Sequence, residues 1–258
     1  MPTLRLPVTF LTHLARRCAA LPRPLLLAAA LLGAASAQTF GFTPTTLDID
    51  ATKNLVAETT MVNSTNAAAR FTVTAKVWKV VGGNVVLEDT RDLIVNPATF
   101  TVKPGESQLI RVGVRKKPSG TELSYRILVQ QEAIEGVALP KVNTGFGDGR
   151  TAGLNVNVSF SLPIYVTAPG AKPQVTFQAT ERGKDLILNV QNAGNRRQIY
   201  RNVVVTRGSV SQSTQMIAAL AGSTLTFTLP GLAEQRGPLT LKYLSEDGRT
   251  LVETIAVP

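Results

Sequence analysis

Residues 154–166 read LNVNVSFSLPIYV, and in the first nine positions apolar side chains alternate with polar ones. Successive side chains of a β strand point to opposite faces, so the alternation predicts one long strand with a continuous apolar row. The apolar positions are Leu154, Val156, Val158, Phe160 and Leu162. Such a row fits a half-buried strand on its own core, and it equally fits a strand whose row is lent to another protein.

The chain before this stretch consists of short alternating or β-branched runs separated by Gly, Pro and Asn turn signals. With the stretch itself there are about seven runs, a number typical of an immunoglobulin-like sandwich. The six preceding runs are 45–49, 56–62, 69–81, 84–90, 107–114 and 124–131.

A boundary follows at residues 167–173, where two prolines and a glycine interrupt regular structure. A second set of predicted strands then begins, at 174–179, 185–192, 202–206, 224–229, 239–243 and 250–257. The predicted fold is therefore all-β, with two immunoglobulin-like β-sandwich domains, 38–168 and 169–258, joined by a short linker.

The first 37 residues have the features of a secretory signal peptide. Four arginines precede a short apolar core at residues 24–32, and Ala35-Ser36-Ala37 is a cleavage site of the A-x-A type. The core is too short to span a bilayer, and no later segment comes close to the ~20 residues that a span needs. We therefore expect an exported, soluble mature protein without a membrane span.

Removing the leader leaves a mature chain without cysteine or histidine, which limits the kinds of catalytic and metal sites that it can form. The only cysteine of the full sequence, Cys18, and its only histidine, His13, both lie in the leader. A mature protein without either residue excludes Cys nucleophiles, Ser-His-Asp triads, disulfides and the usual zinc sites, so we expect no enzyme, no cofactor and no metal. Without the leader arginines the formal net charge falls from +10 to +6, and no basic block with interleaved aromatics indicates nucleic-acid binding.

Several segments together resemble the periplasmic pilus-assembly chaperones of the PapD-like superfamily, and within it the archaic chaperone–usher branch that serves spore-coat-U-like subunits. They occur in the family's order, over nearly all of residues 40–169. The segments are FTPTTL at 42–47, VN at 62–63, VW at 77–78, DLIVNP at 92–97, KPG at 103–105, QLIRV at 108–112, ELSYRI at 122–127 and SLPIYV at 161–166.

The resemblance implies a non-enzymatic periplasmic chaperone whose partners are pilin subunits and an outer-membrane usher. Such chaperones insert the last strand of the first domain into an incomplete subunit sandwich, so main-chain ladders form and alternate side chains fill pockets. The donor side chains here would be Leu154, Val156, Val158, Phe160 and Leu162. The segment of about twenty residues before this strand is long for a loop in a compact domain, which favours a functional role.

The basic pair that anchors the subunit's C-terminal carboxylate in the best-known branch is absent, because its positions match Thr46 and a site at or beside Pro163. The strand 124–131 should run antiparallel to the donor strand, which brings Arg126 beside its later half as a candidate anchor. The alternative for Arg126 is a surface ion pair with Glu122 or another acid. Arg111 is a weaker candidate for the anchor, and so is Arg115, which alternation places on the same strand face.

Other features have simpler interpretations. Glu122 matches one member of the family's inter-domain ion network, but its basic partner falls near Thr167. Trp78 is expected in the core of the first sandwich. The main alternative function is a two-domain immunoglobulin-like surface adhesin or structural binding protein, which would more often cluster long loops at one end.

Overall fold

The computed structural model describes residues 40–134, 136, 141–145, 151–155 and 157–257. These residues form β strands joined by turns, with one short 3-10 turn, η2, at Leu232–Glu234. Among them, no helix is long and apolar enough to cross a membrane. The predicted signal peptide lies outside the described residues.

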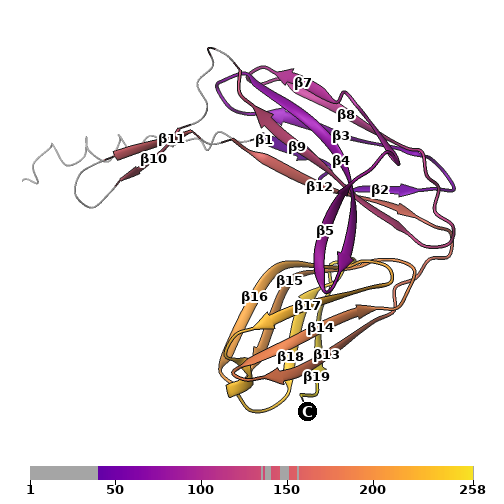
Figure 1. The fold of residues 1–258 in the computed structure, drawn as a ribbon, viewed down its shortest axis with the longest axis vertical. Helices are drawn as coiled ribbons and strands as arrows, with labels where there is room; N and C mark the ends of the chain where they lie inside the picture. Colours follow the sequence, from indigo (N-terminus) through magenta and orange to yellow (C-terminus); the bar gives the residue numbers. More distant parts are fainter. Residues whose placement is uncertain (1–39, 135, 137–140, 146–150, 156, 258) are drawn as a thin grey trace, which may run out of the picture. The chain divides into compact units, whose positions relative to one another are not determined.

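The first sandwich consists of two facing sheets (Figure 1). One has the strand order β1-β3-β8-β6, and the other has the order β2-β12-β9-β4-β5, with β7 pairing on β4. The strands are β1 (Phe40–Thr43), β2 (Leu47–Asp50), β3 (Val56–Asn63), β4 (Ala69–Val81), β5 (Asn84–Asp89), β6 (Leu93–Asn96), β7 (Thr99–Val102), β8 (Ser107–Val114), β9 (Leu123–Glu132) and β12 (Ser159–Thr167).

The alternation of apolar residues along these strands builds the core between the two sheets. On β9 the buried apolar positions are Tyr125, Ile127 and Val129, and on β12 Ile164 and Val166 are fully buried beside them. Burying each such side chain contributes roughly 1.5–3 kcal/mol, so the period-two pattern of the sequence determines which face of each strand turns inward.

The expectation of one continuous strand over residues 154–166 is wrong. A short hairpin, β10 (Lys141–Gly145) with β11 (Thr151–Asn155), precedes β12, and Leu154 pairs with Val142 inside it. β11 ends at Asn155 and β12 starts at Ser159. Because pairing between neighbouring segments closes only a short loop, the first part of the stretch finds its ladder partner locally. The segment expected to be a loop thus contains strands.

The second sandwich also has two sheets, with the orders β13-β14-β17 and β16-β15-β18-β19. Its core is a separate cluster that includes Leu186, Leu188, Val205 and Leu241, all buried. The strands are β13 (Val175–Arg182), β14 (Asp185–Asn192), β15 (Gln198–Arg207), β16 (Val210–Ala219), β17 (Ser223–Leu229), β18 (Leu239–Leu244) and β19 (Thr250–Ile255).

Candidate functional site

The strand β12 has two neighbours along only half of its length. Its antiparallel partner β9 pairs with it from Ser159 to Val166, whereas β2 pairs in parallel only from Ile164 to Thr167. Residues 159–163 therefore have a strand partner on one side only, within the described part of the chain. An unpaired strand edge of this kind is a template for adding another strand.

The hydrogen bonds between β9 and β12 determine which backbone groups of β12 point to the open edge. The Gln131 N–H donates to the Val158 carbonyl oxygen at 2.9 Å, so residue 158 directs its backbone groups towards β9. In a strand the direction alternates, and residues 159, 161 and 163 direct theirs towards the open edge. Ser159 and Ser161 thus present an N–H and a carbonyl there, and Pro163 a carbonyl alone.

The five predicted donor side chains are not all in one place. Leu154 lies on β11, and Val156 lies outside the described residues. Val158 and Phe160 are half-buried at the rim of the first core, whereas Leu162 is 3% exposed and belongs to that core. Of the row, the structure leaves Val158 and Phe160 accessible beside the open edge.

Two aromatic side chains that the sequence did not single out cover Phe160. The ring of Phe42 lies 5.0 Å from that of Phe160, and the ring of Phe40 lies 6.1 Å from it, edge to face. Both come from β1, the end strand of the other sheet. Phe40, Phe42 and Phe160 form a half-buried aromatic cluster that joins the two sheets at their open edges.

On the outer face of the β12 sheet, a row of side chains crosses the strands at the level of Pro163. Pro163 pairs with Arg126 on β9, which pairs with Lys76 on β4. Thr46 immediately precedes Leu47, the register partner of Ile164, so it belongs to the same row. The antiparallel arrangement predicted for β9 and β12 is therefore confirmed, and Arg126 lies one strand away from Pro163 and two strands away from Thr46.

The guanidinium of Arg126 is held by contacts on this face. It lies 3.9 Å above the ring centre of Trp78, and its Nη1 donates to Ser161 Oγ at 3.0 Å. Its Nε is buried without a hydrogen-bond partner, and no acid pairs with Arg126 among the described residues. Burial lowers the pKa of Arg126. A half-buried cation without a counter-ion favours an anionic ligand.

The other candidate anchors lie elsewhere. Arg111 is on β8 in the opposite sheet, exposed, and its Nε is 2.6 Å from Glu58 Oε1. Arg115 follows the end of β8. Neither belongs to the row that contains Arg126.

Glu122 pairs with Arg197, not with Arg126. Arg197 Nη1 lies 2.6 Å from Glu122 Oε2, both side chains are almost fully buried, and Nη2 contacts Asp48. Thr167 Oγ1 donates to the same Glu122 oxygen at 3.1 Å. Thr167, near which the resemblance placed the basic partner of Glu122, contributes a hydroxyl, and the positive charge comes from Arg197 in the second sandwich. In the sequence, the one feature that pointed to Arg197 is the excess of basic over acidic residues in the second domain, where Arg196 and Arg197 are adjacent.

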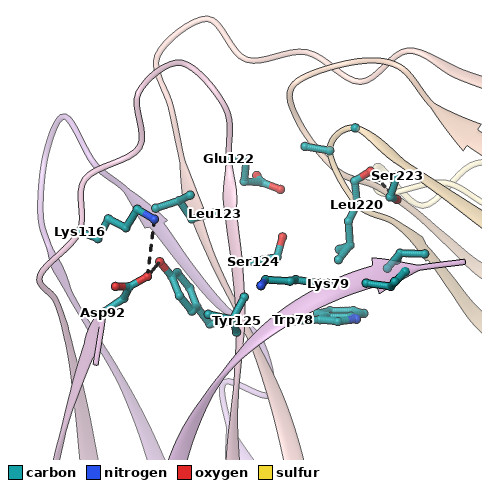
Figure 2. Close-up of a pocket in the computed structure, with 15 residues that line it drawn as sticks. Trp78, Lys79, Asp92, Lys116, Glu122, Leu123, Ser124, Tyr125, Leu220 and Ser223 are labelled. Atoms are coloured by element: carbon teal, nitrogen blue, oxygen red, sulfur yellow. Dashed lines mark hydrogen bonds and ion pairs between the residues drawn. The ribbon is translucent and has the colours of Figure 1, made fainter. Parts of the chain in front are cut away.

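Trp78 is buried, but the expectation that it lies in the core of the first sandwich is wrong. It packs against Tyr165 of the first sandwich and Ile199, Ala218 and Leu220 of the second. Beside it is a pocket of about 450 Å³, in which Figure 2 shows Asp92 and Tyr125 on one side and Leu220 on the other. Trp78 faces outward from its sheet because Val77 takes the inward position.

No family model matches the sequence, and no curated protein does. Among solved structures, the chaperone–tip subunit complex CsuC–CsuE of the archaic Csu pili of Acinetobacter baumannii matches with a TM-score of 0.64 at 16% identity, covering 85% of this chain and 99% of that one. This protein has the fold of a pilus chaperone. The E. coli chaperone DraB matches with a TM-score of 0.56 at 13% identity, covering 86% of this chain and 97% of that one.

A third match is the Salmonella enterica SafA pilin in complex with the SafB chaperone, with a TM-score of 0.54, 14% identity, and coverage of 84% of this chain and 96% of that one. The predicted fold of two immunoglobulin-like domains and the resemblance to pilus chaperones in fold are thereby confirmed. At these identities the likeness establishes the fold, and the role of the residues must be argued from the site itself.

Proposed function

We propose that this protein is a periplasmic chaperone that binds secreted pilus subunits and keeps them soluble until an outer-membrane usher receives them. The observation that carries the proposal is the open edge of β12 at residues 159–163. A subunit that lacks one strand of its sandwich exposes a complementary edge and an apolar groove, and pairing with β12 would satisfy both. This role requires no catalytic step.

The apolar part of the binding surface would be the rim beside that edge. Val158 and Phe160 supply it from β12, and Phe40 and Phe42 supply it from β1. Leu162 is not included, because it is already buried in the chaperone's own core. Leu154 and Val156 remain predicted plugs, and the hairpin that contains Leu154 would rearrange if they enter the subunit together with Phe160.

Arg126 would hold the C-terminal carboxylate of the subunit. It has no acidic partner among the described residues, whereas Lys76 beside it is already paired with Asp89 at 2.6 Å. A guanidinium can bind a carboxylate with two parallel hydrogen bonds, and its stacking on Trp78 fixes the plane in which it does so. Hydrogen bonds to charged groups contribute about 1.5–3 kcal/mol each.

Replacing Ser161 by proline tests the edge directly. The Ser161 N–H points to the open side, so its loss leaves the β9–β12 ladder intact, and proline is tolerated at strand edges. We expect a folded Ser161→Pro protein that no longer retains a secreted β-sandwich subunit encoded beside it, measured by co-expression and size-exclusion chromatography.

Ser161→Ala is the matched control, because it keeps the N–H and removes only the hydroxyl that Arg126 contacts. It should bind the subunit at least partly. A folded Ser161→Pro protein that binds the subunit as well as Ser161→Ala does would refute donation through this edge.

A further inference from the structure

The tip of the β4–β5 hairpin of the first sandwich contacts the second sandwich. The Thr226 N–H donates to the Gly83 carbonyl oxygen at 3.1 Å. Thr226 is on β17, the end strand of its sheet, so this bond gives a ladder partner to an otherwise unpaired edge. The hairpin therefore links the two domains through backbone groups as well as through side chains.

The approach of the two backbones depends on glycine at one position of the turn. Gly82 and Gly83 form the two-residue turn of the hairpin, and both have positive φ values, +57° and +82°. Positive φ at both central residues is what a type I′ turn requires. A Cβ on Gly83 would lie 2.6 Å from Thr226 Oγ1, whereas a Cβ on Gly82 would meet nothing within 4 Å. The geometry of the turn favours glycine at both positions. The close approach to β17 requires glycine at position 83 only.

Strand β4 connects the contact at Gly83 with Trp78, the residue on which the proposed anchor Arg126 stacks. Val80 packs against the core of the second sandwich, and Trp78, two residues earlier, packs against Ile199 and Leu220. Figure 2 shows Trp78 and Leu220 on the same side of the pocket. The Arg126 guanidinium lies 3.9 Å over the centre of the Trp78 ring. The second sandwich thus supports the ring on which Arg126 rests.

We propose that the β4–β5 hairpin is a positioning element: by docking on Thr226 it holds Trp78 in place, and through Trp78 it orients Arg126 towards the subunit. The proposal rests on the proposed role of Arg126 in binding the subunit carboxylate. A guanidinium that is already oriented loses less conformational entropy when it binds. The second domain would therefore contribute to subunit affinity without touching the anchored carboxylate.

The docking can be tested without a subunit, because Trp78 is the sole tryptophan of the chain. We expect Gly83→Ala to shift the Trp78 emission to the red and to increase its quenching by acrylamide. Gly82→Ala also places a side chain at a positive φ but makes no contact with Thr226, so its spectrum should remain that of the unchanged protein. Identical spectra for the two folded variants would overturn the proposal.

The double variant Gly83→Ala/Thr226→Gly removes the two Thr226 side-chain atoms that the new Cβ would meet, at 2.6 and 2.8 Å, and it keeps the test decisive if Gly83→Ala alone folds poorly. Recovery of the fold and of the original Trp78 emission in the double variant supports the docking contact. A double variant that is as perturbed as Gly83→Ala contradicts it.

The coupling to Arg126 is tested by the affinity for a co-purified subunit, measured for Gly83→Ala, Arg126→Met and both together. We expect Gly83→Ala to weaken binding about tenfold, and to have little further effect once Arg126 is Met. Additive losses would refute the coupling. If the unchanged protein binds no subunit, the proposed function itself fails, whereas the fluorescence result still decides whether the hairpin docks.

Discussion

At the scale of single residues, Arg197 joins parts of the chain that are far apart in sequence. Its guanidinium contacts Glu122 and Asp48 and lies 3.7 Å over the ring centre of Tyr165. The Glu122 side chain has no exposed surface. A buried carboxylate of this kind is tolerable only while its partner is present, so the pair fixes how the second sandwich is attached.

Removing one member of this pair should therefore cost more than removing both charges. We expect Arg197→Met to lower the free energy of unfolding by about 3–5 kcal/mol, because it leaves Glu122 buried and unpaired. Adding Glu122→Gln should recover part of the loss. Urea unfolding of the two single variants and the double variant measures the coupling, and additive losses would mean that the pair is not coupled.

Asp50 provides a pH-dependent test at the end of β2. The hydroxyl of Thr52, followed by Lys53, lowers the pKa of Asp50 from 3.8 to about 2. Since the folded-state pKa is lowered, the contribution of Asp50 to stability is present above pH 3.8 and is lost as the pH falls towards 2. Carbon-13 NMR titration should show this pKa, and Thr52→Val should raise it towards 3.8; an unchanged value would contradict the assigned cause.

At the scale of elements, the strands with strong alternation were predictable. β3, β4, β8, β9 and β14 lie where the sequence places them, within one residue at each end. The strand β16 was missed, because its sequence VSQSTQMIAA is polar over its first half and its apolar residues cluster at one end. β6 and β7, of four residues each, are too short to show a period.

The candidate site was predictable only in part, for reasons that concern tertiary contacts. The position of Arg126 beside β12 followed from antiparallel pairing of consecutive strands, a local rule. The contacts of Phe40 and Phe42 with Phe160 join strands of different sheets, and the alternation of apolar residues along one strand does not predict such contacts. Whether Phe160 is buried depends on these contacts, so alternation could identify the row but not its accessibility.

Each of the two sandwiches has a buried asparagine at the end of one strand, β3 in the first and β14 in the second. Asn63 at the end of β3 donates to the carbonyls of Ala67 and Val102, both at 2.9 Å. Asn192 at the end of β14 donates to those of Arg196 and Ala219, at 2.7 and 2.9 Å. Both side chains are buried, so each amide satisfies carbonyls that water does not reach.

Replacing Asn192 by aspartate keeps the shape of the side chain but removes its donors. We expect the change to reduce the free energy of unfolding by about 1–3 kcal/mol, because two buried carbonyls lose their partner. The exposed Asn84→Asp is a matched control and should change stability by no more than about 0.5 kcal/mol. Thermal melts compare the two, and equal effects would contradict the role of Asn192.

At the scale of the whole molecule, the two sandwiches make different contributions to the candidate site. The first contains the open edge of β12 and the aromatic cluster beside it. The second supplies Arg197 to the buried ion pair and packs against Trp78, which supports Arg126. Binding of a subunit would thus involve backbone pairing on the first sandwich and an anchor whose position depends on both.

Amide hydrogen exchange at β12 tests the central claim most directly. In the unbound protein the N–H groups of Ser159 and Ser161 should exchange rapidly, whereas those of Phe160 and Leu162, directed to β9, should be protected. In a one-to-one complex with a subunit, the account predicts that the Ser159 and Ser161 amides become protected as well. A stable complex in which both amides still exchange as fast as in the unbound protein would contradict it.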